Sequence, residues 1–207
     1  MFLYIFWGLV LLAFLFLYLI YYGIFNPIII REIEYGPLDF FYLEYKGHYR
    51  HVGPTFDKIK RSAARFFKLI QIMGIYYDDP KDVEDLYESR AVLGFFLLSE
   101  ENYEIKTKFR ECNGIGCNYK QLPYCQALHV RFPYKSFISF YVMGYRVYSK
   151  MYEYLKRRDL ALVHGIIEEY HFKQGFIDII LPFGEITEDF NLSKIKRPKY
   201  HIDKKSE

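Results

Sequence analysis

The stretch FLYIFWGLVLLAFLFLYLIYYGI, Phe2 to Ile24, decides the architecture, because it has neither a charged side chain nor a polar face. About 23 helical residues span roughly 34 Å, enough to cross a hydrocarbon core of about 30 Å. Trp7 lies near one end and Tyr21 and Tyr22 near the other, where aromatic membrane anchors are expected. The stretch therefore predicts a transmembrane helix, with residues 1–30 as a membrane anchor.

Two other interpretations fit this stretch less well. A cleaved signal peptide would have a basic start, a shorter apolar run and a small-residue cleavage site, and a buried core helix would have a polar face. Arg31, Lys46 and Arg50 follow the stretch, whereas only the α-amino group precedes it. By the positive-inside rule, this places the body in the cytosol or in the mitochondrial matrix.

Size and composition favour one ordinary domain after the anchor. The chain has 207 residues and a formal net charge of +3, from 28 basic and 25 acidic residues. This balance is untypical of a nucleic-acid-binding surface, so we expect no nucleic-acid partner. The aromatic share of 21% favours a β-rich body.

The body repeats one order of elements: a strand, an amphipathic helix and two further strands. In the first half we expect strands at 40–46, 72–77 and 91–98, and a helix with Thr55 as its N-cap. In the second half we expect strands at 127–132, 164–170 and 176–181, and a helix that opens at residues 133–136. Two βαββ halves predict an α+β fold, with one antiparallel sheet and two helices on one of its faces.

Each predicted helix has one apolar stripe. In the first helix the stripe is Phe56, Ile59, Ala63, Phe66, Phe67 and Ile70, and in the second it is Ile138, Tyr141, Val142, Tyr145, Tyr148, Tyr152 and Leu155. The domain is expected at 31–190, with halves near 40–99 and 125–183, an insertion at 100–124 and a basic tail at 191–207. Glu153 and Arg157 are expected to pair across one helical turn.

Five short motifs carry a family resemblance. They are YYDDP at 76–80, RAVLG leading to LSE at 90–100, FPY at 132–134, EEY at 168–170 and LPF at 181–183. In this order and spacing, the chain resembles the gyrase-inhibitory-protein-like domains, which also serve as ligand sensors in multidrug-responsive activators. With its anchor, it is most similar to the testis-expressed protein 264-like family of endoplasmic-reticulum membrane proteins, which act as autophagy receptors.

The resemblance implies both a ligand groove and a departure. In the multidrug sensors, a glutamate at the position of Glu168, in a Glu-x-Tyr pair with Tyr170, faces a central groove and attracts cations. The more usual reading of Glu168 is a solvent-facing strand residue or one with an internal basic partner. The sequence does not show the long acidic tail of the autophagy receptors, and residues 183–186 and 35–38 fit the aromatic-x-x-aliphatic spacing of their binding motif.

Three cysteines leave several alternatives open. Cys112, Cys117, Cys125 and His129 offer thiolate and imidazole ligands for zinc, but their spacing is unusual and His129 falls in a predicted strand. A disulfide between Cys112 and Cys117 is geometrically feasible. Free, partly buried thiols are the default interpretation, so we expect neither a metal nor a cofactor.

The sequence shows no phosphate loop, nucleophile elbow or His-Glu-x-x-His motif, so we expect a non-catalytic protein. The first hypothesis is a membrane-anchored interaction or scaffold protein in the endoplasmic reticulum. The second is an accessory subunit of a large membrane complex, such as a respiratory assembly of the mitochondrial inner membrane. The third is a sensor domain for a small cationic ligand. The expected partners are the lipid bilayer and other membrane or membrane-associated subunits.

Overall fold

A computed structural model describes residues 2–67, 69–97, 116–160, 165–184 and 190–200. Its body is built on one antiparallel sheet of eight strands, in the order β1-β6-β8-β7-β3-β4-β2-β5. The strands are β1 Arg31–Tyr35, β2 Leu38–Lys46, β3 Ile70–Tyr76, β4 Arg90–Leu97, β5 Asn118–Leu122, β6 Cys125–Pro133, β7 Ile166–His171 and β8 Phe176–Phe183. The helices are α1 Phe2–Tyr21, α2 Gly53–Ala63, α4 Ile138–Met143 and α5 Ser149–Arg157, with a π-helical turn, η3 Gly144–Tyr148, between the last two. The described residues also form two short 3-10 turns, η1 Tyr49–His51 and η2 Leu86–Glu88.

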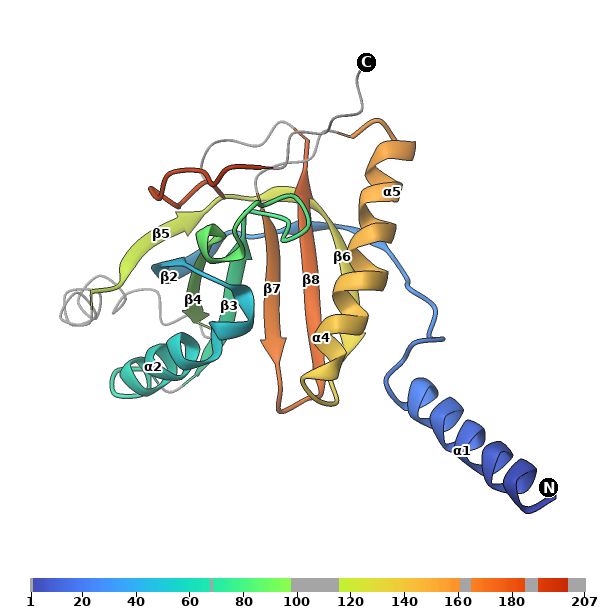
Figure 1. Ribbon diagram of the computed structural model, residues 1–207. Coiled ribbons are helices and arrows are strands. Elements are labelled where there is room, and N and C mark those ends of the chain that lie inside the picture. The colour runs from blue at the N-terminus through green and yellow to red at the C-terminus, as the bar shows by residue number, and fades with distance from the viewer. Residues whose placement is uncertain (1, 68, 98–115, 161–164, 185–189, 201–207) are drawn as a thin grey trace.

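The predicted order of elements, a strand, a helix and two further strands, occurs twice in the fold. The first half is β2-α2-β3-β4 and the second is β6-α4-α5-β7-β8, and they meet where β3 pairs with β7 at the centre of the sheet. Figure 1 shows α2 and the α4–α5 helix on the same side of the sheet, one over each half. The fold is therefore α+β, with both helices on one face.

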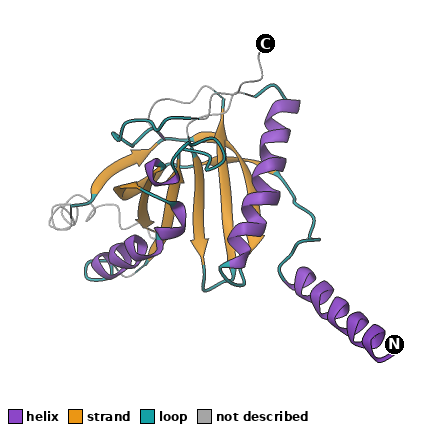
Figure 2. Ribbon diagram, in the orientation of Figure 1, coloured by secondary structure: helices purple, strands orange, loops and turns teal. Residues whose placement is uncertain are grey.

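The short strands β1 and β5 were not predicted from the sequence, and they extend the sheet and curl it. β1 and β2 run past β5 and β6 in one continuous antiparallel register, with Tyr35 opposite Cys125 and Leu38 opposite Leu122. Gly36 lies between β1 and β2, where a Cβ atom would come within 2.5 Å of the Pro123 carbonyl oxygen. This close approach requires glycine. It lets β1, at one end of the strand order, continue directly into β2, near the other end of the curled sheet (Figure 2).

Apolar side chains cover both faces of the sheet. Alternation along each strand sends one set towards the helices and the other set to the opposite face. The core on the helix side includes Phe41, Phe95 and Phe132, and the opposite core includes Phe40, Met73 and Phe190. Burial of both faces explains why β4 is apolar throughout after its first residue, Arg90.

Three local predictions about the helices need correction. Val52, not Thr55, is the N-cap of α2, and Pro54 occupies the first turn. α2 ends at Ala63, so Ile70 belongs to β3 instead of the helical stripe. In the second helix, Tyr141 and Tyr145 are 47% and 78% exposed. The buried row there is Ser139, Met143, Val147, Met151 and Leu155.

α1 is the one described helix that is long and apolar enough to cross a membrane. It projects away from the body, with Trp7 and Tyr21 exposed (Figure 1). Tyr22 is not a lipid-facing anchor, because it is 9% exposed and accepts a hydrogen bond from Ser136 at 3.0 Å. Arg146 of η3 donates to the carbonyl oxygens of Gly23 and Asn26 at 2.6 and 2.8 Å, which fixes the end of the anchor to the second helix.

The described part of the C-terminal segment packs on the body. Phe190 and Leu192 are buried, and the backbone of Val83 pairs with that of Tyr200. Tyr200 also donates a hydrogen bond to Asp78 at 2.6 Å. The segment predicted as a basic tail is therefore bound to the domain as far as Tyr200.

Candidate functional site

Glu168 lies at the centre of the sheet, on the face that the helices cover. It is in β7, directly opposite Gly74 of β3, and it is only 6% exposed. Its neighbours along the strand, Ile166 and Tyr170, belong to the core on the same face. A Cβ atom on Gly74 would come within 2.9 Å of the Tyr76 ring, so this glycine leaves room for the ring beside Glu168.

Tyrosine hydroxyls surround the Glu168 carboxylate. Tyr148 of η3 donates to one carboxylate oxygen, and Tyr170 donates to the other at 2.6 Å. The hydroxyls of Tyr170 and Tyr76 are 2.5 Å apart, which extends the network from β7 to β3. Among the described residues, the Glu168 carboxylate has the hydroxyls of Tyr148 and Tyr170 as hydrogen-bond partners, and no lysine or arginine forms an ion pair with it. The carboxylate is therefore buried, and no residue in the described ranges compensates its negative charge.

Burial dominates the protonation of this network. It raises the pKa of Glu168 above its usual value, although the hydrogen bonds from Tyr148 and Tyr170 oppose that change. The pKa values of Tyr148, Tyr170 and Tyr76 are raised well above the ordinary value, first by burial and then by the charge of Glu168. The tyrosines thus remain hydrogen-bond donors throughout the physiological pH range.

An open pocket lies beside this network. Tyr152, one helical turn beyond Tyr148, forms part of its wall, and the cavity has a volume of about 350 Å³. Burial and the nearby charges of Asp79 and Asp82 raise the pKa of Tyr152 to about 12. The pocket is lined by Tyr77, Asp78, Asp79, Asp82, Tyr152 and Tyr200. Arg90 already pairs with Asp78 at 2.7 Å, but Asp79, Asp82 and the aromatic rings make this pocket suited to a cation.

The structure brings together the two groove residues that the sequence singled out, Glu168 and Tyr170. The solvent-facing interpretation of Glu168 is wrong, because the residue is 6% exposed, and its hydrogen-bond partners among the described residues are hydroxyls instead of basic groups. Tyr76 and Tyr148 were missed as partners. Tyr148 stood in a predicted apolar stripe, and its spacing of four from Tyr152 was the available signal.

The cysteines do not gather into a site among the described residues. Cys117 and Cys125 are free and buried, and Cys112 lies outside the described part of the chain. Burial raises the pKa of Cys125 to about 11, so its thiol is protonated at neutral pH. His129, the fourth residue of the zinc hypothesis, instead contacts Asp178 at 2.9 Å.

The segment at residues 35–38, one of the two with the spacing of an autophagy motif, does not expose its aromatic residue. Tyr35 is 8% exposed and donates a hydrogen bond to Glu169 at 2.6 Å, so it is a core residue. The second segment, 183–186, extends beyond Gly184 into residues outside the described ranges. We therefore expect no function for the motif at residues 35–38.

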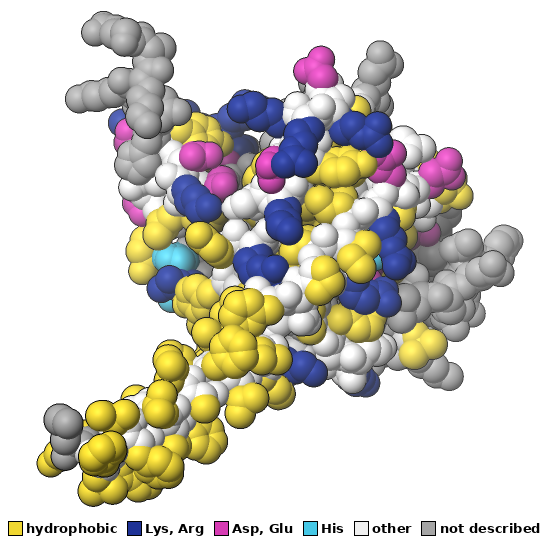
Figure 3. Space-filling view, turned by 90° about the vertical axis from the view of Figure 1, so that its right-hand side faces the viewer, with side chains coloured by type: hydrophobic (Ala, Val, Ile, Leu, Met, Phe, Trp, Pro, Cys, Tyr) yellow, Lys and Arg dark blue, Asp and Glu magenta, His cyan; other side chains and the backbone are white. Residues whose placement is uncertain are grey.

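The face next to the anchor is partly apolar and partly basic. Figure 3 shows apolar side chains along α1 and several Lys and Arg side chains on the adjoining face of the body. Exposed aromatic residues of this region include Phe137, Tyr141 and Tyr145. Such a surface is suited to a bilayer or to another membrane protein.

No family model matches the sequence, and no curated protein matches it either. Solved structures do match. The EcmrR C-terminal domain aligns with a TM-score of 0.55 and 9% identity, over 77% of this chain and 99% of that domain. EcmrR in its DNA complex aligns with a TM-score of 0.58 and 10% identity, over 85% of this chain and 65% of that one. An uncharacterized conserved protein from Listeria innocua has a TM-score of 0.51 and 10% identity, over 75% of this chain and 92% of that chain.

These similarities support the gyrase-inhibitory-protein-like fold that the sequence predicted. They do not single out the testis-expressed protein 264-like family. Two further matches are described as hydrolases from Listeria innocua, with TM-scores of 0.46 and 0.47. With such descriptions among the matches, the expectation of a non-catalytic protein, which rested on the absence of catalytic motifs, is not kept, and no reaction is assigned to this chain.

Proposed function

We propose that this protein is a membrane-anchored receptor for small organic cations, with Glu168 as the buried counter-charge. The observation that carries the proposal is the surroundings of this carboxylate. It is 6% exposed, yet the described residues supply it with hydroxyl donors and no positive charge. Burying an uncompensated carboxylate is costly, so a cationic guest would gain more there than a neutral one.

The aromatic surroundings favour a guest that is both cationic and apolar. The ring of Tyr170 packs edge-on against Phe56, with centroids 5.2 Å apart, and Tyr76 packs in the same way against Tyr49 at 4.8 Å. Ring faces attract cations, and their apolar area stabilises the body of a lipophilic ligand. The pocket beside Tyr152 gives such a ligand an acidic entrance.

Opening of the network is a step that binding requires. In this structure the hydroxyl of Tyr148 donates a hydrogen bond to one carboxylate oxygen of Glu168. Tyr148 belongs to the π-helical turn η3, and such turns are frequent at functional sites because their hydrogen bonding is irregular. Displacement of the Tyr148 side chain would join Glu168 to the pocket at Tyr152.

The test is a comparison of a cation with a neutral molecule of similar shape. The full-length protein in detergent micelles is titrated with tetraphenylphosphonium and, separately, with triphenylphosphine oxide. We expect the cation to bind more tightly and the substitution Glu168→Gln to weaken its binding at least about tenfold, or about 1.4 kcal/mol. Glu153→Gln is the matched control, because it removes the same charge from the exposed pair with Arg157. Equal affinity in the Glu168→Gln variant would refute the proposal.

A docking function is the second proposal. It is supported by the exposed aromatic side chains beside the anchor, with Phe137 53% and Tyr145 78% exposed. In this role the protein would be a scaffold similar to the testis-expressed protein 264-like family, or an accessory subunit in the mitochondrial inner membrane. Purification in a mild detergent, with mass spectrometry of the chains that accompany it, tests this proposal. Loss of one specific partner on Tyr145→Ser would support it, and an unchanged set of partners would remove this surface from consideration.

The orientation of the body is a further part of both proposals. The positive residues that follow the anchor place it in the cytosol or the matrix. Protease treatment of sealed endoplasmic-reticulum vesicles and mitochondria, with antibodies to the body, distinguishes the two locations. A body protected inside endoplasmic-reticulum vesicles would contradict this orientation.

A further inference from the structure

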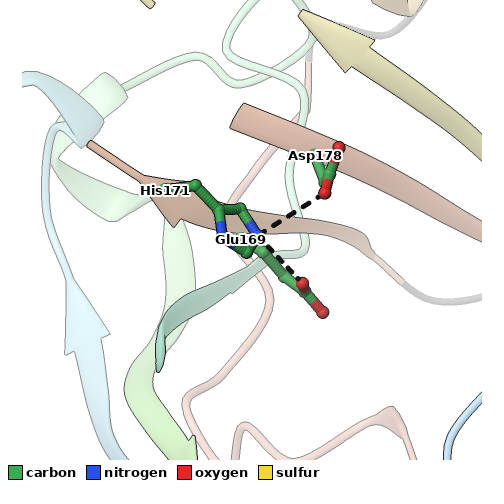
Figure 4. Close-up of side chains that lie close together, drawn as sticks. All are labelled: Glu169, His171 and Asp178. Carbon is green, nitrogen blue, oxygen red and sulfur yellow. Dashed lines mark ion pairs between the residues drawn. The ribbon is translucent and has the colours of Figure 1, made fainter. Parts of the chain in front are cut away.

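Three potential metal ligands lie together on the sheet face opposite Glu168. Glu169 and His171 are alternate residues of β7 and therefore point to the same side, and Asp178 of β8 is directly opposite Glu169. Figure 4 shows the His171 ring with its side-chain nitrogen directed at both carboxylates. The three ligand atoms all lie within 4.8 Å of one another.

The distances from the His171 nitrogen to the two carboxylates are long for hydrogen bonds, and they match the spacing of ligand atoms around a metal ion. His171 Nε2 is 3.5 Å from Glu169 Oε2 and 3.5 Å from Asp178 Oδ2. The same nitrogen is buried and has no hydrogen-bond partner among the described residues. Ligand atoms about 2.0 Å from a tetrahedral zinc ion are roughly 3.3 Å from each other. We propose that Glu169, His171 and Asp178 bind one divalent cation of the zinc type.

Neighbouring groups hold the two carboxylates in place from the outside. Tyr35 donates to Glu169 Oε1 at 2.6 Å, which leaves Oε2 facing His171. His129 contacts Asp178 Oδ1 at 2.9 Å, and Arg131 donates to the same oxygen at 2.8 Å. Outer hydrogen bonds of this kind orient the ligands in protein metal sites.

Arg131 competes with the metal ion for one oxygen of Asp178. Its Nη2 donates to Asp178 Oδ2 at 2.9 Å, so the metal must share this oxygen or displace the guanidinium. The Arg131 side chain is 58% exposed and can turn to solvent without burying its charge. Two carboxylates and one guanidinium leave a formal charge of −1, which attracts a divalent cation.

Three protein ligands leave a fourth position of the shell open. Zinc sites with three protein ligands and an open position are typical of sites that bind water or a substrate group. The His171 side chain is 17% exposed, so the site adjoins the surface. This site is independent of the proposed cation receptor, since Glu168 faces the other side of the sheet.

The experiment uses the full-length protein in detergent micelles, stripped with a chelator and titrated with zinc chloride by calorimetry. We expect one zinc ion per chain and no measurable binding at this site in the His171→Ala variant. His48→Ala is the matched control, because His48 lies in a different part of the surface and contacts its own loop. Absence of binding in the wild type, or equal binding in His171→Ala, would overturn the proposal.

Two further measurements keep the test decisive if His171→Ala fails to fold. Tyr35→Phe removes one hydrogen bond from Glu169 and should weaken zinc binding about 10- to 100-fold. Cobalt(II) in place of zinc should give a spectrum without a thiolate charge-transfer band, and Cys125→Ser should leave the affinity unchanged. A thiolate band, or loss of binding in Cys125→Ser, would assign the metal to the cysteines and refute this site.

Discussion

Glu168 and Glu169 are adjacent on β7, yet they face opposite sides of the sheet in opposite surroundings. Glu168 has tyrosine hydroxyls as partners, whereas Glu169 lies beside Asp178, which Arg131 and His129 contact. Burial alone would raise the pKa of Asp178, but hydrogen bonds from His129 and Arg131 outweigh it and lower the pKa to about 2. Arg131 thus compensates the charge of Asp178 on one face, whereas no described residue supplies a positive charge to Glu168 on the helix face.

A third buried carboxylate, Asp78, gives the strongest test of this comparison, because Arg90 compensates its negative charge. It accepts hydrogen bonds from Arg90 at 2.7 and 3.0 Å and is 4% exposed. We expect Arg90→Leu to lower the free energy of unfolding by about 3–5 kcal/mol, because it leaves this carboxylate unpaired. Urea denaturation measures the loss.

Lys46→Leu is the control for that experiment. Lys46 lies opposite Arg90 on β2, but its ion pair with Glu88 is between side chains that are 43% and 45% exposed. Exposed pairs contribute at most about 1 kcal/mol. Equal losses in the two variants would mean that burial does not decide the value of these charges.

The second-largest expected effect is that of a substitution at Gly74, on the sheet face that the helices cover. The added Cβ of Gly74→Ala would come within 2.9 Å of the Tyr76 ring, which must then move away from Tyr170. We expect a loss of about 1–3 kcal/mol in unfolding free energy, together with weaker binding of tetraphenylphosphonium. Gly144→Ala, whose Cβ has nothing within 4 Å, should preserve both properties. Wild-type cation binding in Gly74→Ala would show that Tyr76 is not part of the site.

The sequence predicted the two halves because their strands are apolar runs and their helices have clear stripes. It missed β1 and β5, which are short and carry polar residues on the exposed side. Their place depends on pairing between residues far apart in the chain, such as Tyr35 with Cys125. The C-terminal segment up to Tyr200 was missed for a similar reason, since its binding rests on partners in the loop after β3.

The site was predictable in part. Glu168 and Tyr170 stood out through a resemblance, but the sequence could not tell whether a basic residue would reach them. Aromatic residues misled the reading of the second helix, because Tyr141 and Tyr145 count as apolar while they lie at the surface. The Glu-x-His spacing of Glu169 and His171 within a strand was visible, but their third partner comes from β8.

A pH titration of stability tests whether Glu168 is uncompensated. Its pKa is raised in the folded protein above the usual 4.5, so the folded state holds the proton more tightly than the unfolded chain. The wild type should therefore lose stability as pH rises above about 4.5, until the folded carboxyl ionises. Glu168→Gln cannot ionise, so it should be more stable than the wild type at pH 8, with the difference vanishing near pH 4. Denaturation midpoints that differ by the same amount at both pH values would contradict this.

The smallest expected effect comes from a matched pair of hydroxyl deletions, one on each face. Tyr148→Phe removes a donor from Glu168, and Tyr35→Phe removes a donor from Glu169. Each should cost about 0.5–1.5 kcal/mol, the usual value of one hydrogen bond. The hydrogen bond from Tyr148 opposes the rise in the pKa of Glu168, so its loss should raise that pKa further and make the cost grow with pH. Tyr35→Phe in chelator-treated protein is the reference, because it makes the same chemical change beside the glutamate of the other face. Urea denaturation of both variants at pH 5 and pH 8 measures the difference, and identical pH dependence would mean that both faces compensate their glutamates equally.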